Sequence, residues 1–191
     1  MVAFPQISKS RLRKKLLSYF LTNPKTQLYL REAASVLSED AGNLSKELAM
    51  LEKIGIFNSR FSGKQKYFSL NRKYPLYNEL KSVVFKTIGI EGSLKELLEK
   101  VEGIKVAFIY GSFAEGKEDA SSDIDLFLVG SPDEDTLMGK IELLEKRLGR
   151  EINYNIYPGK EFKEKLRRKD GFIVNLMKRP KILLKGSFDG I

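Results

Sequence analysis

Two runs of apolar residues constrain the fold of this chain more than any other feature. They are "IKVAFIY" at residues 104–110 and "IDLFLVG" at residues 124–130. Each has the length of a strand and carries few polar side chains, which is typical of strands covered on both faces. A third strand is predicted at 150–158, after a helix at 131–149. The order strand, short helix, strand, helix, strand predicts an α/β (α+β) fold with a mixed sheet flanked by helices.

Capping signals and a basic tail extend this half of the chain. Ser131 is the predicted N-cap of the long helix, and Ser93 begins a capping box in a helix predicted at 92–103. A basic helix is expected at 160–178 and a final strand at 181–186. These elements complete a C-terminal domain that we place at residues 103–191.

The first 73 residues follow a different pattern. Apolar residues recur at helical spacing in 10–23, 28–38 and 39–56, and two strand runs joined by a Ser-Gly-Lys-Gln turn follow at 56–61 and 66–70. Three helices and a hairpin in this order resemble the winged helix-turn-helix domains of bacterial and archaeal regulators. The sequence therefore predicts a winged helix domain at the N-terminus, and linking helices at residues 74–102.

The positive charge of the chain is concentrated in this N-terminal part. The whole chain has a net charge of +9, and residues 1–73 hold 14 Lys and Arg against 5 Asp and Glu, so they account for all of it. A basic domain beside a neutral one is expected where the first part meets nucleic acid or another polyanion. A solvated lysine-rich surface is the alternative.

The winged helix pattern also indicates which residues would contact double-stranded DNA. In such domains the third helix enters the major groove and the hairpin touches backbone phosphate. The candidate DNA contacts are Asn43, Ser45, Lys46, Arg60, Lys64 and Lys66. The alternative is a domain that only dimerises or packs against a neighbour. The acidic side chains of Glu39, Asp40 and Glu47 favour this alternative, because carboxylates repel phosphate.

Composition limits the chemistry that the chain can perform. It contains no cysteine and no histidine, which excludes disulfides, thiolate nucleophiles, cysteine-ligated metals and a histidine base. Carboxylates, hydroxyls and amines remain, and they suit a hard cation such as magnesium. No apolar run has the length of a membrane span and no signal peptide pattern is present. We therefore expect a cytoplasmic protein without a membrane partner.

The candidate site lies where the two apolar runs meet. Gly111 and Ser112 follow the first run, and Asp123 and Asp125 stand at the start of the second. Side chains alternate along a strand, so the two carboxylates share one face, roughly 7 Å apart. Acids at a sheet edge cost folding energy unless they are paired or bind a cation. Magnesium on the acids and a triphosphate at the Gly-Ser turn would suit attack at an α-phosphate.

The stretch "GSFAEGKEDASSDIDLFLV" is similar to the motif of the minimal nucleotidyltransferases of the DNA polymerase β superfamily. The resemblance covers about residues 88–160, and relatives with an N-terminal winged helix are similar over nearly the whole length. It implies that Gly111 and Ser112, with Ser122, bind the nucleotide triphosphate. It also implies that Asp123 and Asp125 ligate Mg²⁺ or Mn²⁺.

Two positions depart from that family. Active members carry a third carboxylate on the strand after the long helix, where this chain has Asn153. An amide can ligate a cation through oxygen but cannot take a proton from an attacking hydroxyl. Glu151, two residues earlier, is the expected substitute. The second departure is Glu115, which stands where the family often has arginine and would repel phosphate if it faced the site.

These observations predict a magnesium-dependent nucleotidyltransferase that transfers a nucleoside monophosphate from a nucleotide triphosphate to an unknown acceptor. Its candidate catalytic residues are Asp123, Asp125, Glu151 and Asn153. One alternative is a DNA-binding transcriptional regulator whose nucleotidyltransferase domain only senses nucleotide or is inactive. Another is an antitoxin-type enzyme that modifies a partner protein. A homodimer is compatible with each of these hypotheses.

Overall fold

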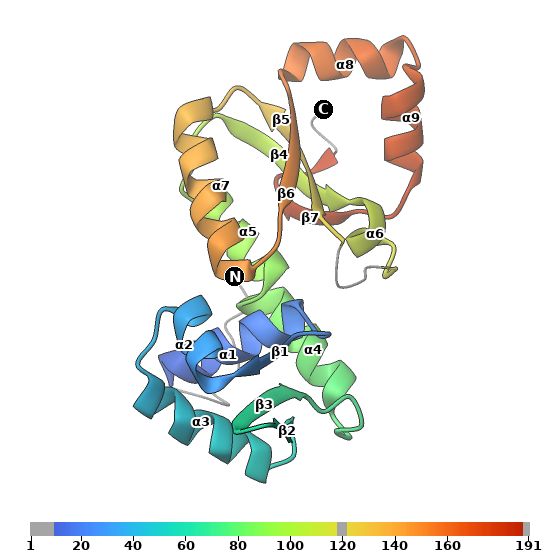
Figure 1. Ribbon diagram of the computed structural model, residues 1–191. Helices are drawn as coiled ribbons and strands as arrows, with labels where there is room; N and C mark the ends of the chain where they lie inside the picture. Colours follow the sequence, from blue (N-terminus) through green and yellow to red (C-terminus); the bar gives the residue numbers. More distant parts are fainter. Residues whose placement is uncertain (1–9, 118–121, 189–191) are drawn as a thin grey trace. The chain divides into compact units, whose positions relative to one another are not determined.

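The computed structural model describes residues 10–117 and 122–188 and divides the chain into two compact units, residues 1–92 and 93–191 (Figure 1). The division falls within the segment 74–102 that the sequence predicted as linking helices. Helix α4 (Tyr77–Thr87) belongs to the first unit, because Val84 packs in its core. Helix α5 (Ile90–Glu99) crosses the division.

The first unit combines four helices with a small antiparallel sheet. The helices besides α4 are α1 (Arg11–Thr22), α2 (Leu30–Leu37) and α3 (Ala41–Lys53), and the strands are β1 (Gln27–Tyr29), β2 (Phe57–Ser62) and β3 (Gln65–Leu70). The sheet order is β1-β3-β2. Phe20 of α1 packs edge-on against Phe57 of β2, with ring centroids 4.8 Å apart. The three helices and the hairpin predicted from the sequence are present, but residues 28 and 29, predicted as the start of the second helix, belong to strand β1.

The second unit is built on a four-stranded mixed sheet. Its strands are β4 (Ile104–Tyr110), β5 (Ile124–Gly130), β6 (Ile152–Tyr157) and β7 (Ile182–Lys185), and its helices after α5 are α6 (Gly111–Ala114), α7 (Glu134–Leu148), α8 (Gly159–Arg167) and α9 (Gly171–Lys178). The strand order is β6-β5-β4-β7. Strands β5 and β6 run parallel, and the other pairs are antiparallel. The predicted mixed sheet is therefore confirmed.

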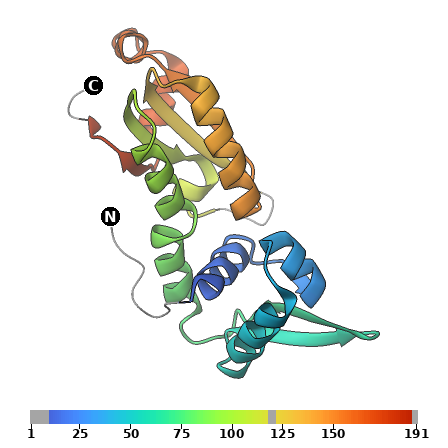
Figure 2. The ribbon, with the colours of Figure 1, turned by 90° about the vertical axis from the view of Figure 1, so that its left-hand side faces the viewer.

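Helices cover both faces of this sheet. Figures 1 and 2 show α5 and α7 along one face, and α8 and α9 lie on the other. Phe108 and Phe127 stack on the second face with ring centroids 5.2 Å apart, and Phe162 of α8 packs on Phe127 at 5.7 Å. Strand β5 thus lies between β6 and β4 as an inner strand, and its first residues lie at the end of the sheet where the strand begins.

Three further helix boundaries differ from the sequence prediction. Helix α7 begins at Glu134 rather than near Ser131, because the Asp133 side chain accepts the first-turn N–H of Thr136 and acts as N-cap. Helix α5 begins at Ile90, so Ser93 lies buried inside it and is not a cap. The basic segment at 160–178 forms two helices, since Asp170 caps a new helix instead of continuing the first. No helix in the described residues is both long and apolar enough to cross a membrane.

Candidate functional site

The antiparallel pairing of β4 and β5 brings the Gly-Ser turn against Asp125. Tyr110, the last residue of β4, pairs with Asp125, and Gly111 begins α6 directly afterwards. Gly111 has φ +68°, and a Cβ atom built on it would lie 2.2 Å from Oδ2 of Asp125. A side chain at this position would require the left-handed backbone and a shift of the Asp125 carboxylate, so glycine is favoured. The glycine and the aspartate singled out in the sequence are thus in direct contact.

The parallel pairing of β5 and β6 adds an amide to the two acids. Asn153 is in register with Asp125, and its Nδ2 donates a hydrogen bond to Oδ2 of Asp123 at 3.3 Å. Two residues further along β6, Nδ2 of Asn155 donates a hydrogen bond to the Tyr110 hydroxyl at 3.0 Å. Asp123, Asp125 and Asn153 therefore form one polar group across two neighbouring strands.

Glu151 does not join this group. It lies just before β6 with an exposed side chain, and its backbone carbonyl accepts the N–H of Ile124 at 2.9 Å. Within residues 10–117 and 122–188, no three acidic side chains gather closely enough to hold a metal ion. The described site has two carboxylates and an amide in place of three carboxylates.

The surroundings of Asp125 disfavour its ionised form. Partial burial raises the pKa of Asp125, and the neighbouring charge of Asp123 raises it further. Tyr110 behaves in the same way, since burial and then the charge of Asp125 raise the pKa of its hydroxyl. Burial and a neighbouring negative charge therefore both disfavour the ionised forms of Asp125 and Tyr110.

Arg150 is a buried residue that contacts two segments of the site, and no local pattern in the sequence indicates this role. It is 7% exposed, its Nη1 donates to the backbone carbonyl of Ser122 at 2.7 Å, and its guanidinium lies 5.5 Å from the ring centroid of Phe113. Ser122 precedes Asp123, and Phe113 lies in α6. Arg150 thus links the segment that leads into the acids to the helix that follows the Gly-Ser turn.

A family model matches most of the second unit. Residues 92–176 match the family model Polymerase beta, Nucleotidyltransferase. The matched nucleotidyltransferase domain contains the Gly-Ser turn, both aspartates, Asn153 and Arg150.

Two solved structures are similar to part of the chain. One is a crystal structure of a toxin-antitoxin with AMP-PNP, at 16% identity, and the other is a mutant of the toxin-antitoxin MntA-HpeT, at 14%. Each alignment covers 52% of this chain and 76% of the other, with a TM-score of 0.39. A comparison with curated proteins found no match.

Glu115, the acidic departure in the nucleotidyltransferase domain, is held by two basic residues. Nζ of Lys117 lies 3.0 Å from one carboxylate oxygen, and Nη1 of Arg179 lies 3.7 Å from the other. The hydrogen bond from Lys117 lowers the pKa of Glu115. The Glu115 charge is therefore compensated by basic residues of the second unit.

The residues predicted to contact DNA lie in the first unit and are exposed to different degrees. Asn43, Ser45 and Lys46 are exposed on α3, opposite the buried Leu44 and Leu48. In the hairpin, Lys64 is exposed at the turn, while Arg60 donates to Gln27 and Lys66 pairs with Glu52 at 2.7 Å. A pocket of about 520 Å³ is lined by Ser45, Lys64 and Lys66. The structure thus brings α3 and the hairpin together on one surface.

Proposed function

We propose that the second unit is a magnesium-dependent nucleotidyltransferase that transfers a nucleoside monophosphate from a nucleotide triphosphate to an acceptor hydroxyl. One observation carries the proposal: the Asp125 carboxylate lies against Gly111, with Asp123 and Asn153 beside it. The family match over residues 92–176 supports the reaction class. Cytoplasmic location is part of the same proposal, because nucleotide triphosphates are cytoplasmic substrates.

The donor atoms present fit a divalent cation. Asp123 and Asp125 offer carboxylate oxygens, and Asn153 offers an amide oxygen while its Nδ2 points to Asp123. Oxygen donors of this kind suit Mg²⁺ or Mn²⁺. When bound, the ion would neutralise charge that develops on the phosphates during transfer. The raised pKa of Asp125 supports this assignment, because a cation would stabilise its ionised form.

Other groups of the site would bind the triphosphate and accept the proton that the acceptor hydroxyl releases. Backbone N–H groups at Gly111 and Ser112, with the Ser122 hydroxyl, are the proposed contacts to phosphate. The acceptor oxygen forms a bond to the α-phosphorus, the bond to the bridging oxygen breaks, and pyrophosphate leaves. The acceptor proton would pass to Asp125 or to water, since an asparagine at 153 cannot accept it.

The first test is transfer from α-labelled nucleotide triphosphates, with magnesium, into an extract that contains protein, RNA and small metabolites. We expect label in one acceptor class with the unaltered chain and none with Asp123→Asn, Asp125→Asn. Glu134→Gln, Asp135→Asn is the matched control, because both residues are exposed in the first turn of α7 and the change removes the same two negative charges. Label in protein would favour the antitoxin-type hypothesis. Loss of label in the control would refute the assignment of the two acids.

We further propose that the first unit is a winged helix domain that binds double-stranded DNA. The element order α1, β1, α2, α3, β2, β3 supports a winged helix, with α3 as recognition helix and β2-β3 as wing. Ser45 of α3 and Lys64 of the hairpin line one pocket, which supports a shared DNA surface. The pairing of Lys66 with Glu52 leaves Lys46 and Lys64 as the strongest phosphate contacts.

Duplex binding measured by fluorescence anisotropy at several salt concentrations tests this second proposal. We expect Lys46→Glu, Lys64→Glu to weaken binding at least about tenfold and to reduce the salt dependence, because phosphate contacts release counterions. The control Lys25→Glu, Lys73→Glu changes the net charge of the same unit equally at two other exposed positions. Equal loss in both variants would show that only overall charge matters. Duplex binding without any nucleotidyl transfer would favour the regulator hypothesis.

A further inference from the structure

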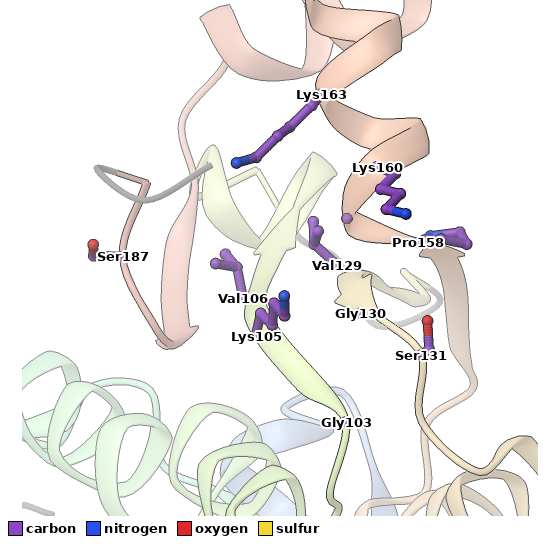
Figure 3. A pocket seen from close by; sticks show the side chains of 11 residues that line it. Gly103, Lys105, Val106, Val129, Gly130, Ser131, Pro158, Lys160, Lys163 and Ser187 are labelled. Carbon is purple, nitrogen blue, oxygen red and sulfur yellow. The ribbon is translucent and has the colours of Figure 1, made fainter.

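A second pocket, of about 760 Å³, lies at the opposite end of the sheet from the two aspartates. It is lined by the start of β4, the end of β5 and the first residues of α8 (Figure 3). Val129 of β5 lines it, four residues beyond Asp125, which places the pocket about 13 Å along the strand from that carboxylate. We propose that this pocket binds a small molecule that carries phosphate groups, at a site separate from the proposed nucleotide site.

Three lysines give the pocket a positive charge. Lys105 comes from β4, and Lys160 and Lys163 come from α8. No carboxylate in the described parts of the chain lies within ion-pair distance of these amines. In Figure 3 the Lys163 side chain extends from α8 across the pocket, and Lys105 rises from β4. The three charges are therefore available to a ligand.

The position of Lys105 results from an irregularity in the sheet. Ile104 pairs with Gly130 and Val106 with Val129, so Lys105 is one extra residue in β4. Such a β-bulge changes the direction of a side chain relative to a regular strand. Without the bulge, Lys105 would alternate with Val106 and point away from the face on which Val106 packs. The bulge thus accounts for a lysine and a valine in the lining of the same pocket.

Backbone groups surround the lysines. A Cβ atom on Gly130 would lie 2.1 Å from the Gly103 carbonyl oxygen, so bare backbone forms this part of the lining. Gly159 begins α8, and its N-cap residue Pro158 provides no side-chain hydrogen bond to the helix. The N–H groups of the first turn have no acceptor within the helix and are suited to phosphate. Lysine amines and helix N–H groups together favour phosphate over a singly charged anion.

The size and isolation of the pocket indicate a small ligand that is not the transfer substrate. Its volume lies in the range of small-molecule sites. Phe108, Phe127 and Phe162 pack on the same face of the sheet between the pocket and the aspartates. This aromatic layer separates the two sites, so a ligand held by the lysines would not reach the proposed metal.

The test is a titration of the ¹⁵N-labelled full chain with inorganic pyrophosphate, in EDTA and at physiological ionic strength, followed by amide NMR. We expect saturable shifts at Gly130, Gly159 and Lys160. We expect the double variant Lys160→Ser, Lys163→Ser to weaken binding at least about tenfold, as expected for the loss of two charged hydrogen bonds. The control Lys140→Ser, Lys146→Ser removes two lysines of α7 and should bind pyrophosphate like the unaltered chain.

Three results would overturn the proposal. One is a shift confined to Gly111 and Ser112, which would place pyrophosphate at the proposed nucleotide site only. Another is an equal loss of pyrophosphate affinity in the α7 control, which would show that only the net charge of the chain matters. The third is equal affinity for citrate, which would show a site for any multivalent anion. The spectra of each variant also report whether it folds, so a folding failure cannot be mistaken for lost binding.

Discussion

Asn153→Asp tests the proposed cation site most directly, because it supplies the third carboxylate that active members of the superfamily carry. In EDTA the variant should be less stable than the unaltered chain. The hydrogen bond from Asn153 Nδ2 to Asp123 Oδ2, 3.3 Å long, is lost, which costs about 1 kcal/mol. Both residues are exposed, so repulsion between the two carboxylates adds about 1 kcal/mol at near-aqueous dielectric. The melting temperature of the second unit should fall by roughly 10 °C.

Magnesium should reverse this loss. A third negative charge strengthens cation binding, and an ion at about 100 times its Kd stabilises the folded state by about 2.7 kcal/mol. Calorimetry in EDTA and then with increasing magnesium measures both effects. Asn153→Ala is the control, because it removes the hydrogen bond without adding charge. If Asp and Ala variants melt together in EDTA and respond equally to magnesium, Asn153 does not belong to a cation site.

Two further predictions concern glycine and charge. Gly111 and Gly116 both have φ +68°, but only a Cβ at Gly111 would meet Asp125. Urea unfolding should therefore show a cost of about 1 kcal/mol for Gly116→Ala and a clearly larger one for Gly111→Ala; equal costs would contradict the close contact. The hydrogen bond from Lys66 lowers the pKa of Glu52, so its stabilisation is present above the usual glutamate pKa and is lost as the pH falls through the lowered value. Glu52→Gln should lower the free energy of unfolding by up to about 1 kcal/mol at pH 7 and leave it unchanged near pH 2. The same loss at both pH values would show that the ion pair does not cause it. The variant should also bind duplex DNA more tightly, because Lys66 becomes available.

The parts of the site that depend on local pattern could be predicted from the sequence. The alternation around Ile124 places Asp123 and Asp125 on one face, and the apolar strand before Gly111 brings the turn to the same sheet edge. Contacts between distant segments could not be predicted. Arg150 reaches the Ser122 carbonyl from 28 residues away, and no periodicity indicates such a pair. The N-cap of α7 is Asp133 rather than the predicted Ser131; both residue types are good caps, and only the path of the chain decides between them.

The two departures from the family pattern have related effects on charge. Where the family often has an arginine, this chain has Glu115, but Lys117 and Arg179 hold its carboxylate. One negative and two positive groups leave a net charge of +1, the same as one arginine. Asn153 replaces an acid, so the site itself carries one negative charge fewer than a site with three carboxylates. The cluster around Glu115 thus leaves the local charge as the arginine would, and only the amide at 153 reduces repulsion between the second unit and a triphosphate. At the proposed site, an amide in place of a carboxylate should weaken binding of the cation more than binding of the nucleotide. We therefore expect Asp123→Asn, Asp125→Asn to bind nucleotide triphosphate still, in an equilibrium binding assay, although transfer is lost.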